Sequence, residues 1–467
     1  MEHRLIKGET MSKQTDTRTM LLTASPLQLI ISLSLPAIIG MVVVGLYNLM
    51  DRVFVGQLIN EVAMGAVSVS YPFTLINTGV STLIGVGSAS ILSRAVGKKD
   101  QDTVDKIMGN LIAMNVLLGI IITAVGMIFT RQILILSGAE GEILNNAERY
   151  LRIIFAGSLF VNFAQSSNMI MRGEGLLKQA MVFSAGSAVL NIILDPILIS
   201  ILNPYGMGID GAAYATIFSQ FVYAAFMLWH FMAKSKNVRI HGIRFEKSLA
   251  SEIFGVGFSA MLMQIMTLVQ QTVLYKVASI YGGDSWQILL GAALSTQSFA
   301  FIPLWGMSQG FQPAAGTNYG AKEYDRVKTV TKGFIVGATV LALIFYLPAE
   351  LAPKMVLSWF ITDPSLIEQG YADFRILFST YIILGFLITA ITLFQSLGKA
   401  SKASVIVVFR QIALFIPMAI LLPKVGRLGI HGVFMAPALT DGIIFIVAVL
   451  LVVSEFRNLT KLKKELR

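Results

Sequence analysis

Cysteine is absent from the chain, and histidine occurs only four times. Without cysteine there is no disulfide framework and no thiolate metal site, and so few histidines argue against zinc chemistry. Charged residues are also scarce, at 13% of 467 residues, whereas 55% are hydrophobic. This balance excludes a disordered chain and argues against an ordinary soluble enzyme.

The hydrophobic residues are numerous enough for a protein that crosses a membrane many times. A helix needs about 20 apolar residues to cross the hydrocarbon core, so a dozen crossings use about 240. Long unbroken apolar runs exclude an outer-membrane β-barrel, whose strands alternate. We therefore expect an all-α integral membrane protein with twelve spans, near residues 27–50, 65–92, 107–129, 149–171, 179–201, 211–233, 250–280, 288–315, 330–348, 373–397, 403–422 and 430–455.

Lysine and arginine are concentrated in alternate connections between these spans. The side that holds both termini carries 26 of them, the other side six, and four fall within spans. Cytoplasmic loops carry the positive excess, so we expect a multi-pass protein of the cytoplasmic (inner) membrane with both termini cytoplasmic. The net charge of +10 then comes mostly from these cytoplasmic segments, and no nucleic-acid partner is expected.

The chain contains an internal repeat. Sliding it along itself by 223 residues matches residues 96–104 with 319–327 at a Gly, a Lys, an Asp and a Val, and Gly175 with Gly398. Two parallel six-helix lobes around a central cavity are a transporter arrangement, although a membrane enzyme, a scaffold or a channel is the alternative. The expected parts are a cytoplasmic N-terminal segment (1–25), an N-lobe (26–233, spans one to six), a basic cytoplasmic linker (234–249), a C-lobe (250–455, spans seven to twelve) and a basic cytoplasmic tail (456–467).

Ionisable groups inside spans are costly and mark functional sites. Asn191 and Asp195 lie one helical turn apart in span five, and Thr216 of span six comes at about the same depth, roughly 22–24 Å from the cytoplasmic side. Asp51 and Tyr47 lie near the outer end of span one. On position alone, Asp51 could instead be an exposed residue at a helix end.

These five residues are the candidate coupling-cation site. Carboxylate, amide and hydroxyl oxygens suit Na⁺, a hard cation, with Asp51, Asn191 and Asp195 as its ligands; the carboxylates could instead carry a proton. Pro196 frees a helix carbonyl near Asp195, and Pro36 gives span one a place to bend.

Other polar groups within the spans are weaker candidates. Arg410 of span eleven and Asp441 of span twelve lie at matching depths, which predicts an ion pair with a structural or gating role rather than a substrate site. Amides in spans four and seven are candidate substrate contacts, although interhelical hydrogen bonds are the commoner use of such groups. They are Asn162, Gln165, Gln264 and Gln271.

On these residues the chain resembles the multidrug and toxic compound extrusion (MATE) transporters, over essentially all twelve spans, and within them a bacterial multidrug exporter type. The strings that carry the resemblance are Leu35-Pro36, Asp51 to Gly56, Met171 to Gly175, Leu190-Asn191 with Leu194 to Pro196, Gly211 to Thr216, and Arg410-Gln411 with Pro417. Some relatives carry an acidic residue on span seven, where this chain has only glutamines.

The resemblance implies an antiporter without enzymatic activity. An inward gradient of Na⁺ or H⁺ would drive export of amphipathic, mostly cationic drugs and dyes by alternating access, with Asp51, Asn191 and Asp195 binding the coupling cation. It also implies a monomer in membrane lipid with no cofactor and no ATPase partner. The alternative within the same superfamily is a flippase for a lipid-linked sugar or a lipid, which would need cationic residues in the cavity.

Overall fold

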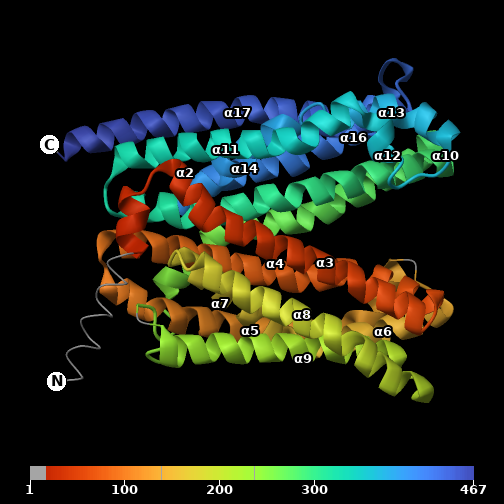
Figure 1. Cartoon of the computed structure of the whole chain (residues 1–467), viewed down its shortest axis with the longest axis horizontal. Helices are drawn as coiled ribbons and strands as arrows, with labels where there is room; N and C mark the ends of the chain where they lie inside the picture. Colours follow the sequence, from red (N-terminus) through yellow and green to blue (C-terminus); the bar gives the residue numbers. More distant parts are fainter. Residues whose placement is uncertain (1–16, 138, 236, 467) are drawn as a thin grey trace.

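The computed structural model describes residues 17–466 apart from Gly138 and Lys236. Residues 1–16 of the expected N-terminal segment, Lys236 of the expected linker and Arg467 of the expected tail lie outside the described residues. The described residues form helices and connecting turns, without a strand. Figure 1 shows two lobes side by side, with α4 to α9 in one and α10 to α17 in the other, while α2 lies against α11 of the second lobe.

The N-lobe begins after a short helix at residues 17–23. Its elements, in chain order, are α2 (Pro26–Leu29), the π-helical turn η1 (Ile30–Ser34), α3 (Leu35–Leu58), α4 (Glu61–Lys98), α5 (Gln101–Leu136), α6 (Gly141–Ala156), α7 (Ser158–Gly173), α8 (Leu177–Leu202), the 3-10 turn η2 (Asn203–Tyr205), α9 (Gly208–Trp229) and the π-helical turn η3 (His230–Lys234).

The C-lobe contains α10 (Lys247–Gly320), α11 (Tyr324–Leu351), α12 (Pro353–Leu357), α13 (Pro364–Phe378), α14 (Tyr381–Ser396), α15 (Ala400–Val408), the π-helical turn η4 (Phe409–Phe415), α16 (Ile416–Leu421), the 3-10 segment η5 (Leu422–Arg427) and α17 (Ile430–Glu465).

These elements make twelve crossings. Within the described residues, ten helices are long and apolar enough to span a membrane, and α6 with α7, bent by 55°, gives an eleventh. Helix α10 supplies two of the twelve, because its 74 residues are interrupted at Gly283. There the backbone has φ 69° and ψ −162°, a conformation that glycine adopts without steric cost. The predicted twelve-helix class is confirmed.

Two predicted spans differ from the structure. Span four, expected as one helix at 149–171, is broken between α6 and α7 at Gly157, where a Cβ would lie 2.3 Å from the Ile217 side chain. Span ten was expected from 373, but α13 starts nine residues earlier at Pro364. The Asp363 side chain caps that helix by accepting a hydrogen bond from the Ser365 amide at 2.9 Å.

The internal repeat is visible in the backbone of the turns. Lys99 and Lys322, separated by 223 residues, are the non-glycine residues with positive φ in the described chain, at 60° and 64°. Gly175 and Gly398, separated by the same number, also have positive φ, at 84° and 71°. Equivalent turns of the two lobes therefore adopt the same left-handed conformation.

One end of the molecule, which we call the terminal face, carries the start of the described chain and the end of α17 (Figure 1). Arg18 of the helix at 17–23 reaches the end of α4 there, and Lys463 of α17 pairs with Asp325 at the start of α11. The turn between α4 and α5 and the turn between α10 and α11 lie at this face. The other end is the distal face.

Candidate functional site

Helices α8 and α9 pack side by side and bring together three of the predicted site residues. Asn191 and Asp195 are 3% and 0% exposed on α8. The Asn191 side-chain amide donates to the Asp195 carboxylate at 3.2 Å and lies 3.4 Å from the Thr216 hydroxyl of α9. The α8–α9 interface therefore holds a carboxylate, an amide and a hydroxyl in one buried cluster.

Two oxygens of this cluster have no hydrogen-bond partner among the described residues. They are Oδ1 of Asn191 and Oδ2 of Asp195. The next residue, Pro196, lies inside α8 and has no N–H to donate to the Ile192 carbonyl one turn earlier. Unpaired buried oxygens are costly, and a bound cation or a proton would satisfy them.

Helix α3 adds Asp51 and Tyr47 to the site. Asp51 is 8% exposed, so it is not the exposed helix-end residue that the sequence left as an alternative. Tyr47 is half-buried. Both residues lie within electrostatic range of Asp195, so the two carboxylates act on each other. No group of three or more acidic, histidine or cysteine side chains that could hold a metal occurs in the described residues.

The first span contacts both lobes. At its start, the π-helical turn η1 precedes Pro36, and the Ser34 hydroxyl donates to the Met307 carbonyl of α10 at 3.2 Å. Farther along, α3 packs against α8, which carries Asp195. A bend near Pro36 would thus move Asp51 relative to Asp195.

Arg410 and Asp441 form a two-point ion pair between η4 and α17. Nε of Arg410 lies 2.6 Å from Oδ1 of Asp441, and Nη2 lies 3.3 Å from Oδ2. The arginine sits in a π-helical turn, a feature that occurs frequently at functional sites. The pair joins the last two spans, and its role as a structural or gating contact stays a prediction.

The four candidate amides lie in different surroundings. Asn162 is fully buried in α7 and hydrogen-bonds with Ser81 at 2.7 Å and Asn77 at 3.4 Å, both of α4. It therefore joins helices within the N-lobe. Gln165, Gln264 and Gln271 are half-buried, and their role as substrate contacts stays a prediction.

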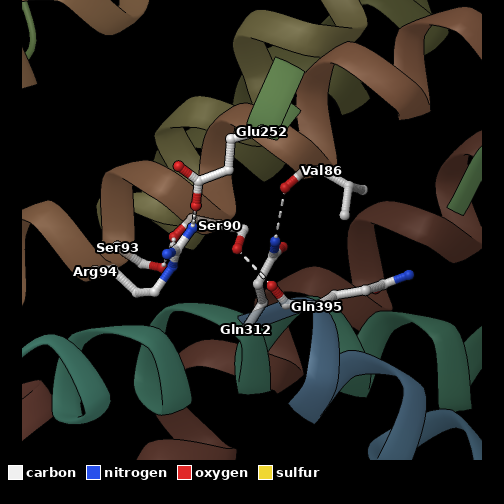
Figure 2. Close-up of polar contacts among 7 residues, drawn as sticks. All are labelled: Val86, Ser90, Ser93, Arg94, Glu252, Gln312 and Gln395. Atoms are coloured by element: carbon white, nitrogen blue, oxygen red, sulfur yellow. Dashed lines mark hydrogen bonds and ion pairs between the residues drawn. The ribbon is translucent and has the colours of Figure 1, made fainter. Parts of the chain in front are cut away.

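The lobes meet at a seam near the terminal face, formed by α4 against α10 and α14. Figure 2 shows three polar contacts across it. The Gln312 amide donates to the Val86 carbonyl at 3.2 Å, Arg94 pairs with Glu252 at 2.6 Å, and the Ser90 hydroxyl donates to the Gln395 carbonyl. We call this contact region the terminal seam.

Glycines allow the backbones to touch at the terminal seam. A Cβ on Gly97 would lie 2.2 Å from the Thr317 carbonyl, and a Cβ on Gly320 would lie 2.1 Å from the Arg94 carbonyl. Gly97 and Gly320 are 223 residues apart, and so are Arg94 and Thr317. The contact is therefore reciprocal between the repeats.

Two buried acidic residues at the ends of predicted spans, Asp373 and Glu455, were not singled out from the sequence. Asp373 of α13 is 1% exposed, and its Oδ1 lies 2.7 Å from Nδ1 of His431. Glu455 of α17 is fully buried and pairs with Lys399 at 2.5 Å and Lys402 at 2.6 Å. Asp373 is the first residue of the expected span at 373–397, and a span started at the capping residue Asp363 would have placed it in the interior.

Twelve crossings in two repeated lobes, with a carboxylate cluster buried in one, define a polytopic membrane transporter. The MatE family model matches residues 36–197 and again 259–421, so the chain belongs to the MatE family. It is similar to the multidrug export protein MepA of Staphylococcus aureus (strain N315), at 27% identity over 423 residues that cover 90% of this chain and 92% of that protein. The expected likeness to bacterial multidrug exporters is confirmed.

Solved structures agree with the fold. An outward-facing multidrug resistance MATE family transporter of the MOP superfamily matches with a TM-score of 0.87 and 26% identity, covering 94% of this chain and 98% of that one. A MATE structure in the bent conformation matches with a TM-score of 0.88 and 26% identity, covering 95% and 98%. The family consists of multidrug efflux transporters rather than enzymes.

Proposed function

We propose that this chain is an antiporter that exports amphipathic, mostly cationic drugs and dyes in exchange for Na⁺ or H⁺ entering the cell. The observation that carries the proposal is the buried cluster of Asp195, Asn191 and Thr216 with its two unpaired oxygens, set within electrostatic range of Asp51. Charge in the low dielectric of a membrane is costly unless an ion or proton neutralises it.

The arrangement supports the exchange of a coupling ion for a solute, because binding of the ion changes the charge of the two carboxylates. With Na⁺ or H⁺ bound, the two carboxylates no longer repel each other, and α3 can approach α8 around Pro36. Without it, the carboxylates attract a cationic solute. A ligand shifts a conformational equilibrium only by binding the two states differently, and these carboxylates supply such a difference.

The proposed orientation places the terminal face in the cytoplasm. The basic residues of the α4–α5 and α10–α11 turns and of the end of α17 lie at that face, as positive cytoplasmic loops do. The half-buried Gln165, Gln264 and Gln271 are the proposed polar contacts of the solute, and membrane lipid is the surrounding partner. We propose a monomer with no cofactor other than the coupling ion.

The test is dye efflux from proteoliposomes under a Na⁺ gradient and a proton gradient imposed separately. We expect one of the two to drive cationic dye transport by the wild-type protein, and Asp195→Asn to reduce it to the level of protein-free vesicles. Asp284→Asn, at an exposed position in α10, is the charge-matched control and should transport normally.

Two outcomes would contradict the proposal. If neither gradient moved a cationic dye, the chain would not be an ion-coupled exporter. If Asp195→Asn transported as well as the wild type, the buried cluster would not be the coupling site.

A further inference from the structure

The helix at residues 17–23 lies across the terminal seam. On the N-lobe side, the Arg18 guanidinium donates to the Val96 carbonyl at 3.1 Å and to the Gly97 carbonyl at 3.0 Å. These carbonyls belong to the last turn of α4, where the regular helix hydrogen bonds run out, and the Val96 carbonyl also accepts the Lys99 amide at 3.3 Å. A cation at a helix C-terminus is also favoured by the helix dipole.

The end of the same segment is bound to the C-lobe. The Asn318 side-chain amide of α10 donates to the Leu21 carbonyl at 2.9 Å. Arg326 of α11 donates to the Leu21 carbonyl at 3.4 Å and also to the Ala24 carbonyl. Leu21 is only 1% exposed, so the helix is packed into the protein rather than lying on its surface.

These two sets of hydrogen bonds lie on either side of the reciprocal glycine contact. Arg18 binds the backbone of Gly97 itself, and Asn318 is two residues before Gly320. Separating the lobes at the terminal face would therefore require one of the two sets to break. The helix connects the lobes in series. Arg18 makes its hydrogen bonds to the N-lobe, and Thr17 and Leu21 lie beside Gly175 in the turn between α7 and α8.

We propose that the helix at 17–23 holds the lobes together at the terminal seam, so that its release from α4 accompanies opening of this face. The assignment concerns the stability of one conformation and does not depend on which ion or solute the protein moves. The role of this helix can thus be wrong while the proposed transport function is right, and the transport function can be wrong while the role of the helix is right.

The test uses the absence of native cysteine. Ser93→Cys places one thiol in the terminal seam, at a residue that is fully buried in the closed seam. Its reaction with a maleimide is followed in purified full-length protein in lipid nanodiscs. We expect Arg18→Ala to raise the labelling rate about tenfold, the effect of losing roughly 1.4 kcal/mol of hydrogen bonding. Arg457→Ala, an exposed arginine of α17, is the matched control and should leave the rate unchanged.

A second variant tests the series arrangement. Asn318→Ala should also raise the labelling rate when it is made alone in the Ser93→Cys protein. In the Arg18→Ala background it should add less than about twofold, because a helix already released from α4 no longer holds the two lobes together. Ser167→Cys, fully buried in α7 inside the N-lobe, reports global unfolding and should stay unreactive throughout.

Three results would overturn the proposal. The first is an Arg18→Ala labelling rate equal to that of the parent. The second is an equal rise at Ser93→Cys and Ser167→Cys, which would mean that Arg18 stabilises the N-lobe as a whole. The third is full additivity of Arg18→Ala and Asn318→Ala.

Discussion

The carboxyl group of Glu174 is buried in the turn between α7 and α8, outside the spans. It is 5% exposed, and its Oε2 has no hydrogen-bond partner in the part of the chain that the structure describes. Burial disfavours the charged form and raises the pKa of Glu174 to about 8 from its usual 4.5. Between these two values the folded protein holds a proton that the unfolded chain releases.

The sign of the resulting pH dependence follows from this proton. Stability should fall as the pH rises from about 4.5 to 8, by up to roughly 1.4 kcal/mol per pH unit. Glu174→Gln is neutral at every pH and should remove this slope. In thermal unfolding of purified protein, the variant should melt at a higher temperature than the wild type at pH 8.5 and close to it at pH 5. Exposed Glu323→Gln is the control, and parallel curves for wild type and Glu174→Gln would contradict the prediction.

At the residue scale, the sequence predicted contacts between polar side chains when the contact depends only on helix periodicity and on depth in the membrane. Asn191 and Asp195 share a helix face by their spacing, and Thr216 was placed beside them by counting rise per residue. Arg410 and Asp441 were paired in the same way. The burial of Asn162 between α4 and α7 was not predictable, because it depends on how two helices rotate about their axes.

At the element scale, the reciprocal contact of α4 and α10 depends on the small size of Gly97 and Gly320. In Gly320→Ala the new Cβ would lie 2.1 Å from a backbone carbonyl of α4, which cannot rotate away as a side chain would. Alanine has a higher helix propensity than glycine, so the substitution alone should stabilise the helix. A loss of stability must therefore come from this overlap. We expect Gly320→Ala to cost about 1–3 kcal/mol and to raise maleimide labelling at Ser93→Cys.

The control for this prediction is the same substitution without a neighbour. Gly186→Ala in α8 adds a Cβ that meets no atom within 4 Å. It should leave labelling unchanged and should not lower the melting temperature. If both alanine variants behaved alike, the close approach at Gly320 would not be what holds the seam.

The sequence predicted which helices exist better than it predicted where each helix begins and ends. Hydrophobicity alone predicted all twelve crossings, because lipid requires each of them to be long and apolar. It could not place the break at Gly157, since that break depends on the Ile217 side chain that packs there. The expected connection between the spans at 250–280 and 288–315 does contain Gly283, where α10 is interrupted. The early start of α13 was visible in principle, as Asp363 and Pro364 are a helix-start pattern.

At the scale of the whole molecule, α4 to α9 and α10 to α17 form the two lobes, residues 21–37 also pack into the core of the second lobe, and the segment between η3 and α10 joins the two. Residues 241–245 of that segment are exposed. We expect a chain cut between His241 and Gly242 to reassemble when the two pieces are co-expressed, because α4 and α10 bury the contact that joins them. Co-purification of the untagged piece with the tagged one checks this. Its absence, with both pieces present in the membrane, would mean that the connection is needed for assembly.

The carbonyl-to-glycine contact at Gly97 and Gly320 obeys a rule of symmetric pairs: position i of one half meets position j of the other, and j meets i. A polypeptide of half this length, inserted twice in the same direction, could satisfy that rule with a second copy of itself. The geometry of the chain is therefore that of a two-fold pair of subunits joined in one polypeptide, with the acidic cluster at Asn191 and Asp195 in one half and the pair of Arg410 and Asp441 in the other.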